Sequence, residues 1–342
     1  MLTIERLFDV PRHQLKNYPN ANMFVTKTAG IWVPMSTADF LDAAMQVSRG
    51  LIALGVQAGD RVAVASNNRV EWNILDIAVQ QAGAILVPLY PNISESDYRF
   101  ILNDAGVELC VVSNQELVDK ITHIKAEVPT LKYLFSFDQV PNCPHWSEIE
   151  ANKGSVEVAA VEERMKEVKA ADLATIIYTS GTTGNPKGVM LSHSNILSTV
   201  GACIDPIPAD KNSKVLSFLP VCHIYERMLH YLYMYIGCSI HFAESMDTIG
   251  DNIREVKPDV FSAVPRLIEK VFDKIMAKGE ELSGIKKTLF YWAVSVAEEY
   301  DVIGKSPIYK IKLGIARKLI FSKWQEALGG NVKAIASGSA AL

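Results

Sequence analysis

Apolar positions along the chain follow two alternating periods. Between Phe40 and Leu54 they recur every three or four residues, which places them on one face of a helix, and Gly55 follows as a C-cap. The next apolar run, Arg61–Ala65, has the length of a strand. Residues 70–83 again have a helical pattern, and residues 84–90 (AILVPLY) form another strand-length run. The pattern therefore predicts helices and strands in alternation.

The same alternation continues toward the C-terminus. Ser94, with Asp97 three residues later, opens a further helix in the capping-box pattern. The strands that we predict after it are Glu108–Ser113, Lys132–Phe137, Leu173–Thr179, Lys214–Leu219, Cys238–Ala243, Asp259–Val264 and Val332–Ser337. Strands that are apolar on both faces and separated by helices predict an α/β fold of helix-covered, largely parallel sheets.

Two features bear on domain organisation. Residues 142–169 are polar and charged, with a helical segment near 156–169, and we expect them to join two sub-lobes of about 1–141 and 170–342. Val332–Ser337 has the composition of a buried strand, yet the chain stops five residues later at Leu342. A core strand without its following helix predicts that this chain is the N-terminal portion of a longer protein.

Composition narrows the class of protein. Of the 342 residues, 49% are hydrophobic and 21% are charged, which excludes a wholly disordered chain, a collagen-like chain and a small disulfide-stapled module. The formal net charge of −4 and a pI near 6.0 argue against a generally basic nucleic-acid binder. No basic patch has the spacing of base-stacking residues, so we expect no nucleic-acid partner.

The cysteines and the apolar stretches predict a cytoplasmic protein. There are five cysteines, an odd number without C-x-x-C spacing, which fits free thiols in a reducing compartment better than disulfides or a zinc site. The N-terminus is mixed and charged, unlike a signal peptide. The most apolar later stretch, 228–243, is shorter than the roughly 20 residues that a membrane-spanning helix needs.

The segment with the clearest chemistry is residues 174–193, ATIIYTSGTTGNPKGVMLSH. A predicted buried strand runs into a loop where Gly181 and Gly184 let backbone N–H groups face a ligand. Lys187 adds a mobile positive charge. The hydroxyl donors in the same loop are Thr179, Ser180, Thr182 and Thr183. Together these groups predict a cradle for a polyphosphate.

Two common phosphate-binding motifs are absent from this loop. A Walker A loop would need Gly at Pro186 and Ser or Thr at Gly188, and no G-x-G-x-x-G is present. The remaining alternative is an ordinary surface loop rich in small residues. The hydroxyl density, the glycine spacing and the lysine, all directly after a strand, favour the phosphate cradle.

The string YTSGTTGNPKGV resembles the phosphate-loop signature of the adenylate-forming, AMP-binding superfamily, which includes acyl-CoA synthetases, luciferases and peptide-synthetase adenylation domains. Two further segments, Phe218–Arg227 and Ser262–Lys270, resemble the long-chain fatty acid branch of acyl-CoA synthetases. Other similar segments, in family order, are Gly59–Val64 with Asn68 and Glu71-Trp72, Ala82–Tyr90 and Ala336–Leu342. The resemblance thus covers nearly the whole chain.

The resemblance implies a ligase that works in two steps. A long-chain fatty acid carboxylate attacks the α-phosphate of ATP to give an acyl-adenylate and pyrophosphate, and coenzyme A then displaces AMP. Mg²⁺ and fixed donors neutralise the departing pyrophosphate. By the family pattern, Thr179 contributes to the Mg²⁺ site and Lys187 assists electrostatically. The residues that the pattern places around the phosphates are Thr179, Ser180, Gly181, Thr182, Thr183 and Gly184.

His223 is the catalytic candidate, because the family places a residue beside the substrate carboxylate and the α-phosphate at this point of the motif. Taken alone, a histidine after a strand is more often a structural hydrogen bonder. The neighbouring Cys222 suggests a thiol nucleophile, but the sequence shows no group that would activate it, so we discount this role.

Several parts of the family pattern are missing from this chain. They are the Tyr-Gly-x-Thr-Glu-type segment whose Glu completes the Mg²⁺ site, the adenine-binding region, the ribose-binding Asp, the hinge and the C-terminal domain with its catalytic Lys. Lys187 belongs to the phosphate loop and cannot take that Lys role. We therefore expect that this chain alone does not complete the ligase reaction.

Two other stretches each allow two interpretations. Residues 225–235, rich in Tyr and Met, are either core packing or the wall of an acyl tunnel. Residues 305–323 hold six cations and no acid, interleaved with apolar residues. They are either a helix with a solvated basic face or a surface for anionic lipid, which would place the protein peripherally at the inner face of the membrane.

Two alternatives to the long-chain ligase stay open at this point. One is another adenylate-forming acid–CoA ligase, for medium-chain or aryl acids. The other is a nucleotide-binding module without ligase activity.

Overall fold

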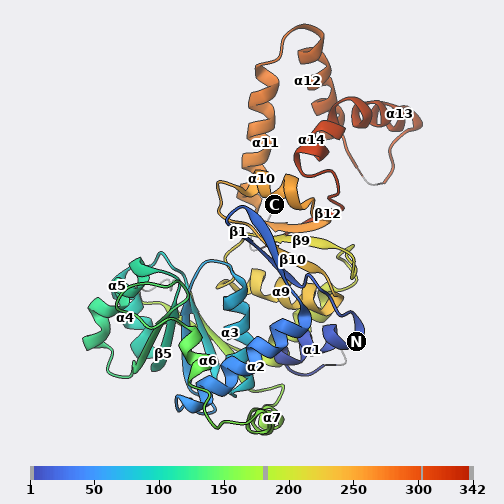
Figure 1. Cartoon of the computed structure of the whole chain (residues 1–342). Helices are drawn as coiled ribbons and strands as arrows, with labels where there is room; N and C mark the ends of the chain where they lie inside the picture. The colour runs from blue at the N-terminus through green and yellow to red at the C-terminus, as the bar shows by residue number, and fades with distance from the viewer. Residues whose placement is uncertain (1–3, 180–183, 302, 339–342) are drawn as a thin grey trace. The chain divides into compact units, whose positions relative to one another are not determined.

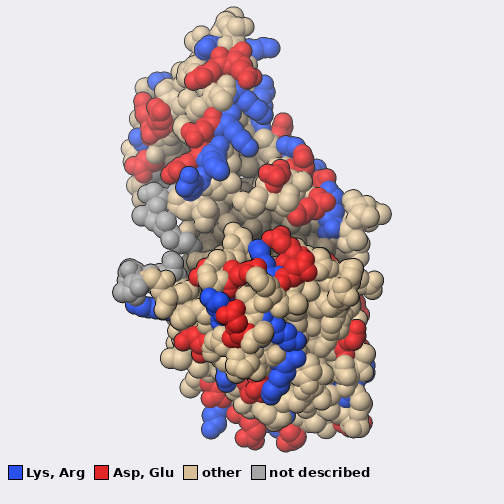
Figure 2. Space-filling view, turned by 90° about the vertical axis from the view of Figure 1, so that its left-hand side faces the viewer, with Lys and Arg blue, Asp and Glu red and all other residues tan. Residues whose placement is uncertain are grey.

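A computed structural model of the protein describes residues 4–179, 184–301 and 303–338. By internal contacts the chain forms two compact units (Figure 1). The first consists of Met1–Ser213 and Ser217–Phe242, and the second of Lys214–Leu216 and Ala243–Leu342. Basic and acidic side chains are intermingled over the visible face of each unit (Figure 2), in keeping with the small net charge.

The first unit contains a six-stranded sheet in the order β6-β5-β3-β4-β7-β8. Its strands are β3 (Arg61–Ala65), β4 (Ile85–Leu89), β5 (Val107–Val112), β6 (Tyr133–Ser136), β7 (Leu173–Thr179) and β8 (Lys187–Ser192). All neighbours are parallel except β8, which runs antiparallel to β7. The predicted α/β fold with largely parallel, helix-covered sheets is confirmed.

Helices cover both faces of this sheet, which is why its strands are apolar on both sides (Figure 1). The helices are α2 (Thr37–Ala53), α3 (Val70–Gln81), α4 (Glu95–Asp104) and α5 (Gln115–Ile124). α4 and α5 pack Tyr98, Leu102 and Ile121 against Val87 and Cys110 of the sheet. The predicted cap is present, since the Ser94 hydroxyl accepts the Asp97 N–H. The predicted strand and helix positions in this region are confirmed.

The first unit contains a second group of strands, of which the sequence predicted only one. β1 (Phe24–Thr28) pairs parallel with β10 (Ser239–Phe242) and antiparallel with β2 (Ile31–Met35). The β1–β2 turn uses Ala29 and Gly30, both at positive φ, as tight hairpins do. β10 was predicted from its apolar run, whereas β1 and β2 were not predicted. The residues of β2, IWVPM, are all apolar, yet none of them is fully buried.

The polar segment 142–169 lies within the first unit. It contains α6 (Ser147–Ala151) and α7 (Val158–Glu167), the latter at the predicted helical position. Its backbone is held by arginines: Arg49 Nε donates to the Val156 carbonyl at 2.6 Å. Gly50 lets α6 approach α2, because a Cβ there would lie 1.9 Å from the Ile149 carbonyl oxygen. A polar composition therefore does not keep this segment from packing.

The second unit contains β9 (Lys214–Ser217, of which it holds the first three residues), β11 (Val260–Ala263) and β12 (Ala334–Ser337). β11 pairs parallel with β9 and β12. Its helices are α10 (Ile249–Val256), α11 (Pro265–Glu280), α12 (Gly284–Glu298), α13 (Pro307–Ala316), a π-helical turn (Arg317–Phe321) and α14 (Ser322–Ala327). β12 lies within the predicted strand Val332–Ser337, but it is only partly buried here, whereas a buried strand was expected.

The other helices of the first unit are α1 (Val10–Asn17), α8 (His193–Cys203) and α9 (Ile224–Ile236), with single 3-10 turns at Leu7–Asp9 and Lys125–Glu127. All five cysteines are free thiols, as predicted. Among the described residues, no helix has both the length and the apolar character that crossing a bilayer would require.

Candidate active site

The predicted phosphate loop joins two antiparallel strands. β7 ends at Thr179 and β8 begins at Lys187, and the strand register places these two residues directly opposite each other. Both are exposed. Ser180, Gly181, Thr182 and Thr183 lie outside the described residues. The pairing of β7 with β8 thus brings a hydroxyl and an ammonium group together at one hairpin end.

Two glycines of the loop signature, Gly184 and Gly188, are required for different structural reasons. Gly184 has φ +105°, a conformation that L side chains rarely adopt, and no heavy atom of the described residues lies within 4 Å of the position that a Cβ would take. Gly188 instead lacks room, because a Cβ there would lie 2.9 Å from Ile176 Cγ2 and 3.1 Å from Tyr178 Cζ. Gly184 therefore leaves the backbone open, whereas Gly188 lets β8 pack closely on β7.

Tyr178 fastens the hairpin to helix α4. Its hydroxyl donates to Asp104 Oδ2 at 2.5 Å, and burial together with this carboxylate raises the pKa of Tyr178. A surface cavity of about 630 Å³ lies beside the hairpin end. It is lined by Ser96, Arg99, Phe100, Asn103, Asp104 and Asn185. The tyrosine of the signature thus has a positioning role that the sequence did not reveal.

His223 is exposed and is the N-cap of α9. Its Nδ1 accepts the Tyr225 backbone N–H at 3.2 Å. A ring nitrogen that accepts a hydrogen bond carries no proton, so in the neutral ring the proton is on Nε2. The cap therefore holds the imidazole with Nε2–H as an available donor. The structural role that sequence alone favoured for His223 and a catalytic role are compatible.

Asn68 fixes the loop that leads to His223. Its Nδ2 donates to Ser217 Oγ at 2.9 Å and to the Leu219 carbonyl at 2.7 Å, and its Oδ1 accepts the Val221 N–H at 2.9 Å. One side chain thereby makes three hydrogen bonds to residues that are about 150 positions away. The family resemblance includes Asn68, but no sequence signal indicated this contact.

Cys222 is buried beside His223, and burial raises the pKa of its thiol to about 12. Because the thiolate is the nucleophilic form, this cysteine is inert at neutral pH. The structure agrees with the decision to discount it as a nucleophile.

Helix α9 carries a buried polar network. Arg227 forms two hydrogen bonds to Asp76, with Nη2 to Oδ1 at 2.5 Å and Nε to Oδ2 at 3.1 Å. The Tyr231 hydroxyl donates to Asp76 Oδ2 at 2.6 Å, and Gln80 Nε2 donates to Asp76 Oδ1 at 2.7 Å. All four side chains are buried. The network clamps α9 to α3 and so fixes the helix whose N-cap is His223.

The Tyr- and Met-rich stretch 225–235 is mostly core. Tyr231 and Tyr233 are 1% exposed, and Met228 and Met234 are also buried. These contacts agree with the core-packing interpretation of the stretch.

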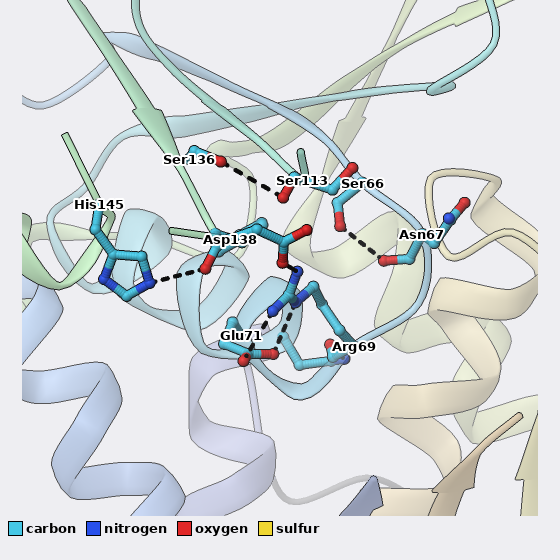
Figure 3. Close-up of polar contacts among 10 residues, drawn as sticks. Ser66, Asn67, Arg69, Glu71, Ser113, Ser136, Asp138 and His145 are labelled. Atoms are coloured by element: carbon cyan, nitrogen blue, oxygen red, sulfur yellow. Dashed lines mark hydrogen bonds and ion pairs between the residues drawn. The ribbon is translucent and has the colours of Figure 1, made fainter. Parts of the chain in front are cut away.

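A further polar cluster lies where β3, β5 and β6 end, at the carboxyl edge of the parallel sheet (Figure 3). Arg69 bridges Glu71 at 2.9 Å and Asp138 at 2.8 Å. His145 Nε2 donates to the Phe137 carbonyl at 2.8 Å. Ligands of open α/β sheets commonly bind at this edge. Here the charges pair with one another and hold the loops together, so we assign the cluster a structural role.

The fold is that of the acyl-CoA synthetase N-terminal domain. The N-terminal domain of FACL13 from Mycobacterium tuberculosis aligns with a TM-score of 0.63 at 22% identity, over 78% of this chain and 64% of that one. A putative long-chain-fatty-acid CoA ligase from Rhodopseudomonas palustris CGA009 aligns with a TM-score of 0.68 at 23% identity, over 80% and 66%. MatB from R. palustris, solved with ATP bound, gives 0.64 at 25% identity, over 78% and 50%.

The chain belongs to the AMP-binding enzyme family, whose model matches residues 11–340. Long-chain-fatty-acid–CoA ligase FadD15 of Mycobacterium bovis is 31% identical over 320 residues, covering 92% of this chain and 53% of that protein. Long-chain-fatty-acid–CoA ligase ACSBG2 of Xenopus laevis is 30% identical over 343 residues, covering 96% and 46%. The chain therefore spans about half the length of the curated relatives it matches.

Proposed function

We propose that this protein is an ATP-dependent ligase that converts a long-chain fatty acid to its acyl-adenylate and then to acyl-CoA. The proposal rests on one observation: the strands on either side of the signature loop, β7 and β8, pair antiparallel and set the exposed Thr179 opposite the exposed Lys187. Long-chain specificity draws support from the names of curated relatives at about 30% identity.

Thr179, Ser180, Gly181, Thr182, Thr183 and Gly184 would surround the β- and γ-phosphates of ATP, with Lys187 offsetting their charge. The open backbone at Gly184 fits close approach by a phosphate. Among the described residues, no group of three or more His, Cys, Asp or Glu side chains could hold a metal ion. Mg²⁺ commonly binds through substrate phosphates, water and few protein oxygens, and Thr179 would be its protein ligand here. Bound Mg²⁺ would neutralise the departing pyrophosphate.

His223 would act as a hydrogen-bond donor. Its capped Nδ1 leaves Nε2–H to stabilise the negative oxygen that the carboxylate or the α-phosphate presents in the transition state. Asn68 would be a positioning residue, because it fixes the loop that ends at His223.

This chain alone would not complete the reaction, since it matches only about half of the curated relatives. The Glu of the Mg²⁺ site, the adenine and ribose contacts and the catalytic Lys would come from sequence beyond that half. Coenzyme A would likewise require residues outside the described ones.

The proposal is tested by pyrophosphate release with Mg-ATP, measured across acids from acetate to oleate and an aryl acid. The protein as its gene encodes it and the 342-residue chain are assayed in parallel. We expect a maximum at long-chain acids for the former and little release from the latter. A maximum at medium-chain or aryl acids would contradict the long-chain assignment, and release that ignores the acid would leave only a nucleotide-binding module.

A matched variant tests the role of His223. His223→Asn keeps a side-chain acceptor for the Tyr225 N–H but removes the Nε2 donor. Loss of one such donor commonly lowers kcat by about 10²- to 10³-fold. Lys166→Ala, on the exposed face of α7, is the control and should leave the rate unchanged. Equal rates for His223→Asn and the control would contradict a catalytic role for His223.

A further inference from the structure

Helix α13 in the second unit has two apolar faces. Its inner face packs on α12, where Tyr309 and Ala316 are buried with Ala293 and Val296, and Leu313 packs against the same cluster. The Tyr309 hydroxyl donates to the Val296 carbonyl at 2.8 Å. Figure 1 shows α13 extending from the α11–α12 pair. The inner face therefore attaches α13 to α12, and the outer face takes no part in this contact.

The outer face presents a stripe of large apolar side chains to solvent. Ile308, Ile311, Ile315 and Leu319 are 69%, 64%, 47% and 42% exposed. Their spacing of three and four residues places them along one side of the helix. A single exposed apolar residue is ordinary, but a contiguous apolar stripe indicates a surface that contacts something else.

The segment that carries this stripe also holds cations without acidic partners. No Asp or Glu occurs between Asp301 and Glu326. The cations of this segment that are exposed are Lys310, Lys312, Arg317, Lys318 and Lys323. In the described part of the chain none of them pairs with a carboxylate. At about 100° per residue, Lys312 and Lys318 point to opposite sides of the apolar stripe.

Helix α11 of the same unit differs from α13, because acidic residues alternate with its lysines. Lys270, Lys274 and Lys278 of α11 are interspersed with Glu269 and Asp273. Figure 2, which faces the α11 side, shows basic and acidic side chains next to one another on this unit. The cations of α13 have no Asp or Glu interspersed among them in the sequence, although the whole chain has a formal charge of −4.

We propose that α13 and its π-helical turn bind an anionic lipid surface. The stripe Ile308, Ile311, Ile315 and Leu319 would enter the boundary between headgroups and acyl chains. The flanking lysines would extend their aliphatic stems along the apolar layer and place their ammonium groups at lipid phosphates. The apolar stripe favours a lipid surface over nucleic acid, which offers no apolar layer for four such side chains. This inference does not depend on the proposed ligase activity.

Flotation with lipid vesicles tests the proposal on the intact protein. We expect binding to vesicles of phosphatidylcholine mixed with phosphatidylglycerol, little binding to phosphatidylcholine alone, and weakening by salt. Lys312→Glu/Lys318→Glu should weaken binding at least about 30-fold, because each cation near an anionic surface is worth about fivefold in affinity and the variant reverses two. Ile311→Ser/Ile315→Ser should also weaken it, about tenfold or more.

The control is Lys274→Glu/Lys278→Glu on α11, which makes the same change in net charge and should leave binding unchanged. As an independent readout, Ile315→Trp should show blue-shifted fluorescence on the mixed vesicles only. Equal losses from the α11 and α13 charge reversals would overturn the proposal, since they would indicate a net-charge effect.

Two other outcomes would also overturn the proposal. If the serine variant binds lipid normally while the charge-reversal variant loses lipid and heparin equally, α13 is a general polyanion site. If the serine variant instead lowers the thermal stability or changes the oligomeric state, the stripe is covered by protein. Because none of these measurements uses ATP or a fatty acid, their failure is distinguishable from failure of the ligase proposal.

Discussion

Helices α9 and α13 are both built of apolar and aromatic residues with cations among them, yet they use the cations in opposite ways. In α9, Arg227 is 1% exposed and bound to Asp76 by two hydrogen bonds. In α13, Lys310 and Lys312 are exposed, and apolar side chains are exposed beside them. The difference lies in the neighbours, since α3 supplies a carboxylate to Arg227 of α9, whereas α12 contacts α13 through an apolar cluster and the Val296 carbonyl.

The comparison is tested most strongly at Arg227. Arg227→Met removes the partner of a buried carboxylate, and breaking a buried ion pair from one side costs about 3–5 kcal/mol. We expect a loss of that size in the free energy of unfolding, measured by urea denaturation. Lys312→Met is the matched control in α13, and we expect a change within about 0.5 kcal/mol because its cation is exposed and unpaired. Similar changes for the two variants would remove the distinction between the helices.

His193, near Arg227, should make the free energy of unfolding depend on pH. Its ring is 2% exposed and Nδ1 accepts the Leu7 N–H at 3.2 Å. Burial, with a further contribution from the Arg227 charge, lowers the pKa of His193 to about 4. In the unfolded chain the pKa is near 6.5, so the stabilisation is complete above about pH 6.5 and is lost as the pH falls toward about 4.

At about pH 5 the His193 contribution should have fallen by about 2 kcal/mol relative to about pH 7.5. His193→Asn keeps an acceptor for the Leu7 N–H but does not titrate. The free energy of unfolding of this variant should therefore change less between these two pH values, by about that amount. The wild type and the variant share every carboxylate, so their difference isolates the histidine. Parallel pH profiles for the two proteins would show that His193 is not held neutral by burial.

The smallest expected effect tests whether α13 is open on its outer side. Gly314, in the middle of α13, has no heavy atom within 4 Å of its Cβ position and no left-handed φ. Gly314→Ala should therefore stabilise the protein by about 0.4–1 kcal/mol, because Ala has the higher helix propensity. Gly279→Ala in α11 should do the opposite and cost about 1–3 kcal/mol, since its Cβ would lie 2.1 Å from Phe290 Cε1. Thermal or urea unfolding measures both, and a destabilising Gly314→Ala would indicate that something packs on α13.

Much of the fold was predictable from local pattern. Strands such as Arg61–Ala65 and Leu173–Thr179 coincide with the observed β3 and β7, because an apolar run of strand length indicates burial on both faces. The hairpin strand β2 was missed although its residues, IWVPM, are all apolar, because a proline inside an apolar run indicates an edge strand or no strand at all. The partial exposure of β12 was also missed, because a strand's position in its sheet depends on which strands pair with it.

The candidate site divides in the same way. The loop signature, with Thr179, Gly184 and Lys187, follows from the residue types alone, because glycines, hydroxyls and a lysine after a strand suit a phosphate. The cap that directs the His223 ring and the three bonds of Asn68 were not predictable. They depend on backbone geometry and on residues that are distant in sequence.

The sequence by itself thus determined the alternation of helices and strands, the gathering of glycines, hydroxyls and a lysine in one loop, and the run of cations over residues 305–323, because each is a local property of residue order. Only the tertiary structure decided which charges are buried and which apolar residues are exposed. Arg227 and Asp76 are 151 residues apart, and whether a cation finds a carboxylate depends on which helices pack together. The same physical reason separates α9 from α13: a charge can be buried without a large loss of stability only where a partner is in place, and folding brings that partner there.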